Sequence, residues 1–137
     1  MIRTRNVLKS DPLRKQVYVV TLDGTLATGD NKLAIPIGGL DSQFGGEIES
    51  IYGHVKTAPT GATLTIQLAN GSTDILSTVL TFAISGTTAS STAITPANKN
   101  VANGDIIDVD IDQVGSTQPG ADLTLTLVVV AHGSQEG

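Results

Sequence analysis

The sequence lacks residue types that several classes of protein require. It contains no cysteine and no tryptophan, and aromatic residues make up only 3% of its 137 residues. Without cysteine the chain has no disulfides, thiolate zinc sites, iron–sulfur clusters or cysteine nucleophiles. Sugars are usually recognised by exposed aromatic rings, and so few rings make a stacking platform hard to build. A carbohydrate-binding protein is therefore disfavoured.

Charge and long apolar runs are also scarce. Charged residues make up 15% of the chain, against about 25% in an ordinary domain. No run approaches the ~20 apolar residues that a membrane span needs, and the polar N-terminus has no apolar signal-peptide core. We therefore expect a soluble protein with no membrane partner. The length is that of one domain.

Threonine, serine, glycine and asparagine take the place of the missing charged residues. Threonine suits a pleated, half-buried surface, whereas glycine and asparagine favour turns. Short alternating runs recur about every ten residues with no segment of helical period, a pattern typical of a β-sandwich or barrel. The cleanest alternation follows Pro59-Thr60-Gly61, and Asn70-Gly71 is a strong hairpin signal. We predict one all-β domain over residues 16–132, followed by a polar tail at 133–137.

The alternation also predicts which side chains form the core, because every second residue of a strand points to the same face. In the run 47–57 the apolar positions change face, which suggests a β-bulge near Gly53. The expected core residues are Val17, Val19, Ile51, Val55, Leu64, Ile66, Leu68, Ile107, Val109, Ile111, Leu123, Leu125 and Leu127.

Two segments of the chain have similar sequences. The run Pro59-Thr60-Gly61-Ala62-Thr63-Leu64 resembles Pro119-Gly120-Ala121-Asp122-Leu123. Similar turn-then-strand chemistry arising independently is the simpler explanation. The alternative is a pseudo-symmetric pair of Greek keys, as in a jelly roll.

Charge is distributed unevenly between the N-terminal segment and the rest. Residues 1–15 carry a net charge of +4, whereas residues 16–137 carry −9. A solvated terminus would explain such an arm; the functional alternative is an arm that docks on an acidic neighbour. Nucleic acid is a less suitable partner, since the acidic body repels phosphate. The candidate partner-binding residues are Arg3, Arg5, Lys9, Arg14 and Lys15.

An acidic run is the most tempting candidate for metal binding. Asp108, Asp110 and Asp112 alternate with buried positions and share one exposed face, with Asp105 just before them. Carboxylate oxygens are calcium ligands. However, the glycine and later glutamate of an EF-hand loop are missing, and alternate strand residues stand about 6.5–7 Å apart. We interpret this run as a solvated polar face and assign no metal.

No catalytic motif is apparent either. His54 and His132 are the only histidines, and neither belongs to a recognisable nucleophile motif. Phosphate-cradling loops of the Walker type are also missing. We therefore expect no enzymatic activity, no catalytic residues and no cofactor.

Four sequence motifs occur together in this chain. They are Gly24-Thr25-Leu26-Ala27-Thr28-Gly29, Val55-Lys56-Thr57-Ala58-Pro59-Thr60-Gly61-Ala62-Thr63-Leu64, Gly104-Asp105-Ile106-Ile107-Asp108-Val109-Asp110-Ile111-Asp112-Gln113-Val114-Gly115 and Pro119-Gly120-Ala121-Asp122-Leu123-Thr124-Leu125. In this combination, residues 46–130 resemble a β-sandwich domain that recurs among virion structural proteins of tailed bacteriophages. The resemblance departs at Asn70-Gly71-Ser72-Thr73, where some relatives have a longer insertion.

The resemblance implies a single jelly-roll-like antiparallel β-sandwich with an extended N-terminal arm at residues 1–15. A solitary domain of this kind looks like a capsid decoration, or cement, protein. Such proteins typically bind the outer surface of the head as homotrimers and clamp neighbouring major capsid protein subunits. The alternative is a receptor- or glycan-binding module on a phage tail or fibre.

Overall fold

The computed structural model describes residues 15–41 and 43–132. Nearly all of its regular structure is β-strand, and the described residues contain no helix long and apolar enough to cross a membrane. In chain order the elements are β1 (Lys15–Thr25), β2 (Gly29–Pro36), β3 (Gly46–Thr57), β4 (Leu64–Asn70), β5 (Thr73–Asp74), β6 (Leu80–Phe82), β7 (Thr88–Ser91), the short 3-10 turn η1 (Pro96–Asn98), β8 (Asn100–Val101), β9 (Ile106–Gln113) and β10 (Ala121–Ala131).

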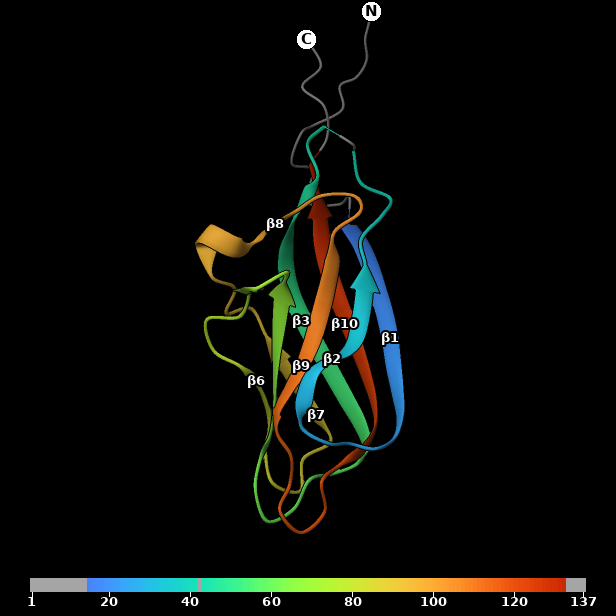
Figure 1. The fold of residues 1–137 in the computed structure, drawn as a ribbon, viewed down its shortest axis with the longest axis vertical. Coiled ribbons are helices and arrows are strands. Elements are labelled where there is room, and N and C mark those ends of the chain that lie inside the picture. The colour runs from blue at the N-terminus through green and yellow to red at the C-terminus, as the bar shows by residue number, and fades with distance from the viewer. Residues whose placement is uncertain (1–14, 42, 133–137) are drawn as a thin grey trace, which may run out of the picture.

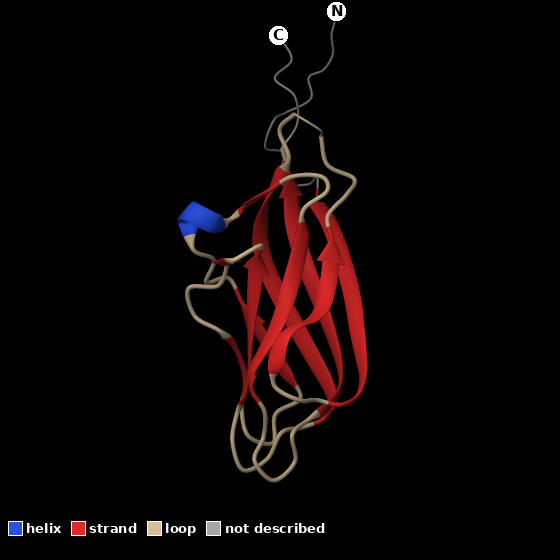
Figure 2. Ribbon diagram, viewed as in Figure 1, coloured by secondary structure: helices blue, strands red, loops and turns tan. Residues whose placement is uncertain are grey.

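Two antiparallel sheets pack face to face (Figures 1 and 2). Sheet A has the order β1-β10-β3-β7, with β8 also pairing with β3. Sheet B has the order β2-β9-β4-β5, with β6 also pairing with β4. Because the chain passes repeatedly from one sheet to the other, sequence neighbours such as β1 and β2 lie in different layers. This is the connectivity of a jelly roll, and it confirms the predicted β-sandwich.

The core lies between the two sheets. Leu123, Leu125 and Leu127 of β10 are fully buried on the inner side of sheet A. Ile107 and Val109 of β9 are fully buried on the inner side of sheet B. The period of two that predicted these positions is therefore confirmed for the central strands.

The core prediction for β1 was wrong. Val17 and Val19 are 58% and 59% exposed, and Tyr18, Val20 and Leu22 pack against the core instead. The cause is the register, since β1 places these three residues opposite the inward leucines of β10. Apolar residues occupy both faces of β1, so its alternation alone does not identify the buried one.

The predicted bulge exists, but it is not at Gly53. Ile48 pairs with Val129 and Ser50 with Val128, so the extra residue on β3 is Glu49. Gly53 pairs regularly with Leu125 of β10. Its importance is steric, because a Cβ added there would lie 2.6 Å from Cζ of Phe82.

The first of the two similar segments, which begins at Pro59, contacts the loop just before the second one at one end of the sandwich. The amide of Thr60 donates to the carbonyl of Gln118 at 2.9 Å, and the amide of Thr117 donates to the carbonyl of Thr60 at 3.0 Å. Gly61 has a φ of +83°, and the loops approach so closely there that a Cβ would clash with Ser116 and Thr117. These turns therefore close the end opposite the start of β1.

Candidate functional site

The start of β1, the start of β3 and the end of β10 lie together at one end of sheet A (Figure 1). Lys15 pairs with Val130, which pairs in turn with Glu47. We call this region the arm end and define it by Lys15, Glu47, Glu49, Lys99 and His132. Of the predicted arm residues, Arg3, Arg5, Lys9 and Arg14 lie outside the described residues.

Lys15 forms an ion pair within its own chain. Its Nζ lies 2.9 Å from Oε1 of Glu49, the residue that the β3 bulge adds. Both side chains are about two-fifths exposed (42% and 41%). Exposed pairs of this kind contribute about 0–1 kcal/mol. The pair of Lys15 with Glu49 therefore contributes little to the stability of the fold.

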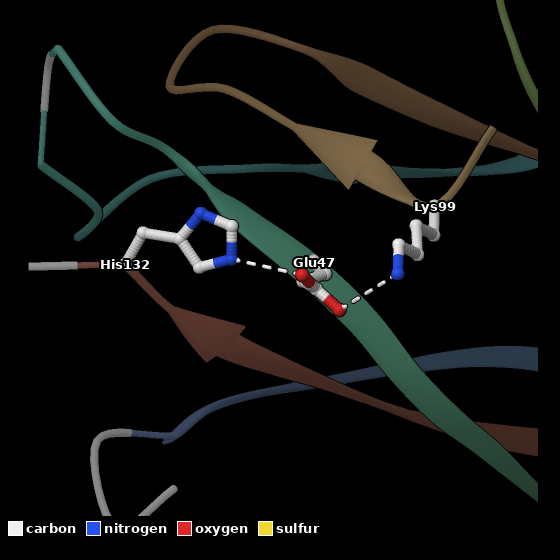
Figure 3. Close-up of polar contacts among 3 residues, drawn as sticks. All are labelled: Glu47, Lys99 and His132. Atoms are coloured by element: carbon white, nitrogen blue, oxygen red, sulfur yellow. Dashed lines mark hydrogen bonds and ion pairs between the residues drawn. The ribbon is translucent and has the colours of Figure 1, made fainter. Parts of the chain in front are cut away.

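Glu47 joins three segments that are far apart in the sequence. Lys99 approaches Oε1 at 3.4 Å, and Nε2 of His132 approaches Oε2 at 3.1 Å. Figure 3 shows the two side chains reaching the carboxylate from different sides. Backbone bonds reinforce the cluster, because the amide of His132 donates to the carbonyl of Gly45. These contacts join the start of β3 to the segments around Lys99 and His132. The cluster was not predicted, because no local sequence pattern links residues 47, 99 and 132.

The outer face of sheet A, which we call the A face, is mostly apolar or hydroxyl-bearing. Val17 lies opposite Val128, and Val19 opposite Thr126. Tyr52, on the other side of Thr126, is 47% exposed. The A face consists of Lys15, Val17, Val19, Thr21, Thr124, Thr126, Val128, Val130, Ser50, Tyr52 and His54, with the charged Glu47 and Lys56 towards the two ends of β3.

The outer face of sheet B, the B face, carries the predicted acidic run. Asp108 and Asp110 are half-buried and Asp112 is exposed, and all three alternate with buried residues of β9. The carboxylate of Asp110 accepts a hydrogen bond from the amide of Asn31 at 2.8 Å. Within residues 15–41 and 43–132 no three acidic, histidine or cysteine side chains come together as a metal site would require.

Loss of water and mutual repulsion both act on a carboxyl of the B face. Partial loss of water raises the pKa of the Asp112 carboxyl, and the neighbouring Asp110 raises it further. Asp74 and Asp30 add to this effect from β5 and β2. The B face is therefore an acidic surface, in contrast with the uncharged centre of the A face.

A shallow polar hollow lies beside β4 and η1. It is lined by Asn70, Thr73, Asn98 and Asn100. Two of the amides already serve the fold, since Asn70 donates to Asp105 and Asn98 donates to the carbonyl of Asp74. No aromatic ring is among these four residues, so the hollow lacks the stacking surface on which sugar recognition usually relies.

Comparison with known proteins gives a likeness in structure. The sequence matches no family model, and it matches no curated protein. The fold is similar to a chain in the solved structure titled "Cyanophage Pam1 capsid asymmetric unit", with a TM-score of 0.53 and 12% sequence identity. The match covers 96% of this chain and 92% of that chain. The two chains therefore share one fold over almost their whole lengths.

Proposed function

We propose that this protein is a non-enzymatic decoration, or cement, protein of a tailed bacteriophage capsid. The observation that carries the proposal is the end-to-end likeness to a chain in a cyanophage capsid structure. Because the match covers 96% of one chain and 92% of the other, the likeness extends over almost the whole of both chains. The sequence resemblance to phage virion β-sandwiches points the same way.

In this proposal the arm end faces the capsid. The basic residues of the arm precede Lys15 in the sequence, and the ion pair of Lys15 with Glu49 is exposed and readily exchanged. Arginine makes paired hydrogen bonds to carboxylates, so Arg3, Arg5 and Arg14 suit acidic positions on major capsid protein subunits. The arm then clamps neighbouring subunits from the outer surface of the head.

The proposed assembly is a homotrimer, as the resemblance implies. Three arms acting on one capsid site raise the effective concentration of each contact. A weak contact per arm can then hold the protein on the capsid for long periods.

The experiment is capsid occupancy of full-length variants, with purified protein added to phage capsids that lack it. We expect Arg3→Gln/Arg5→Gln to reduce occupancy strongly, and the reduction to follow rising salt because exposed charges are screened. The matched control, Lys32→Gln/Lys56→Gln, removes the same charge from the body and should bind like wild type. Equal occupancy for all three proteins would refute the arm contact.

Removing residues 1–14 is the stronger form of the same test. We expect the remaining sandwich to fold, as checked by its thermal unfolding, and to lose its hold on the capsid. A reconstruction of the virion distinguishes the alternative function. Density for this chain only on the tail, or binding to host envelopes and not to capsids, would refute decoration and support the receptor-binding module.

A further inference from the structure

The exposed valines of β1 belong to a continuous apolar surface. Val17 and Val19 are 58% and 59% exposed, and their cross-strand neighbours Val128 and Thr126 are only half-buried. Tyr52 extends the same surface on β3 at 47% exposure. Single exposed apolar residues are ordinary on a protein surface, whereas adjoining ones indicate an interaction site.

The edge of sheet A beside these valines is open. Among the described residues, the backbone partners of β1 along Lys15–Leu22 all lie on β10. The run from Gln16 to Leu22 contains no charge and no proline, and its register is regular up to Leu22. An edge strand of this kind is a template for pairing with another chain, which proteins normally prevent.

The other edges do show such protection. β2 contains Pro36 as well as the charged residues Asp30 and Lys32, and its register shifts between Gly29 and Leu33. β7 has four residues, β6 three and β5 two. Short strands, proline, charge and irregular pairing all discourage edge-to-edge association. Between Lys15 and Leu22, β1 has none of these features beyond Lys15. Its other charged residue, Asp23, and its register shift both come after Leu22, so the edge up to Leu22 is suited to being covered.

Charge identifies the occupant as a second copy. The body of the chain carries −9, and its acidic run gathers on the B face. A basic partner is attracted to the B face, whereas two copies with the same negative charge approach most easily through uncharged surface. The A face provides this surface, because Lys15 is paired with Glu49 and the centre around Val19 and Thr126 is uncharged.

We propose that the A face and the open edge of β1 form the contact between copies of this chain. The contact rests on the self-association in the proposed function and supplies its interface. It does not depend on the capsid assignment. Val17 and Val19 become buried in it, and the backbone of β1 gains a partner.

The first test compares lysine substitutions on the two sheets. Ile106 is the matched control, since it is a β-branched residue, 45% exposed, on sheet B. We expect wild type and Ile106→Lys to sediment well above the 14.0 kDa of one chain. We expect Val17→Lys/Val19→Lys to associate at least about tenfold more weakly. A monomeric wild type, or equal association of both variants, would overturn the proposal.

The second test needs no disruptive substitution, because the native chain contains no cysteine. Val19→Cys and Ile106→Cys are labelled with a maleimide at low and at high protein concentration. We expect labelling of Val19→Cys to slow as the protein associates, and labelling of Ile106→Cys to stay constant. Equal behaviour at both positions contradicts the contact.

The remaining outcomes are also distinguishable. If Val19→Cys is protected at every concentration and loses this protection when residues 1–14 are removed, the arm covers the edge and the proposal fails. Capsid occupancy is measured separately on the same variants. A protein that decorates capsids as a monomer refutes the contact alone, whereas an oligomer that ignores capsids supports the contact and refutes decoration.

Discussion

The two sheets of this sandwich are alike inside and different outside. Their inner faces both consist mainly of leucine, isoleucine and valine, such as Leu125 on sheet A and Ile66 on sheet B. Their outer faces diverge, since the A face presents Val17 and Val19 where the B face presents alternating aspartates. The inner faces hold the fold together, while the outer faces determine what the protein can approach.

The largest expected effect tests whether the inner faces of both sheets contribute to the stability of the fold. Ile66→Ala in sheet B and Leu125→Ala in sheet A should each lower the free energy of unfolding by about 2–5 kcal/mol, because both side chains are fully buried. Urea denaturation measures both values. A cost below about 0.5 kcal/mol for either variant would mean that its sheet does not contribute to the core.

Gly53 tests how tightly the two sheets meet. Gly53→Ala should cost about 1–3 kcal/mol, because the new Cβ would press on Phe82 and Leu125 across a filled core. Gly38→Ala is the control, since nothing lies within 4 Å of a Cβ at that position. If both substitutions leave the unfolding midpoint unchanged, the sheets are less closely packed than the structure shows.

Val19 and Val20 are neighbours on β1 that point to opposite faces of sheet A, Val19 outward and Val20 towards the core. Val20→Ala should cost about 1–2 kcal/mol, since two methyl groups packed on the core contribute roughly 0.8 kcal/mol each. Val19→Ala should change the stability of the dilute, monomeric protein by less than about 0.5 kcal/mol. A larger cost for Val19→Ala than for Val20→Ala would reverse the assignment of the two faces.

The smallest expected effect concerns the B face. The raised pKa of Asp112 means that the folded protein holds this proton more tightly than the unfolded chain does. Its ionisation therefore lowers stability as the pH rises through the window between the ordinary and the raised pKa. Asp112→Asn should stabilise the protein at neutral pH by less than about 0.5 kcal/mol, because the group is largely solvated.

This gain should vanish at a pH below the ordinary carboxyl pKa, where Asp112 is protonated in both states, and it should shrink in concentrated salt. Unfolding curves at the two pH values check both points. A destabilising Asp112→Asn at neutral pH would show that the carboxylate contributes attraction instead of repulsion.

Local sequence patterns predicted the central strands well and the edges less well. Polar and apolar residues alternate from Ile107 to Asp112 in β9 and from Asp122 to Leu127 in β10, so the buried positions there were predictable from the period. In β1 both faces are apolar, and only the pairing of Tyr18 with Leu127 reveals which one is buried. Val17 and Val19 made the core prediction wrong because they are apolar but exposed, and for the same reason they make the A face an apolar surface.

The candidate site likewise has one part that was predictable from the sequence and one part that was not. The basic arm was evident from charge counting, because +4 in residues 1–15 against −9 elsewhere needs no structure. The Glu47 cluster was not evident, because Lys99 reaches it from just before β8 and His132 from just after β10. The bulge at Glu49, which offers a carboxylate to Lys15, depends on the register between β3 and β10.

By itself, the sequence determined the all-β class, the turn positions and the central core, since these follow from each residue's own backbone preference and from a period of two. Only the tertiary structure decided the order of strands within each sheet, the buried face of β1 and the meeting of Glu47 with Lys99 and His132. The physical reason is that strand pairing is non-local. A strand's backbone hydrogen bonds and its register are supplied by segments far away in the chain, so they cannot be read from the strand alone.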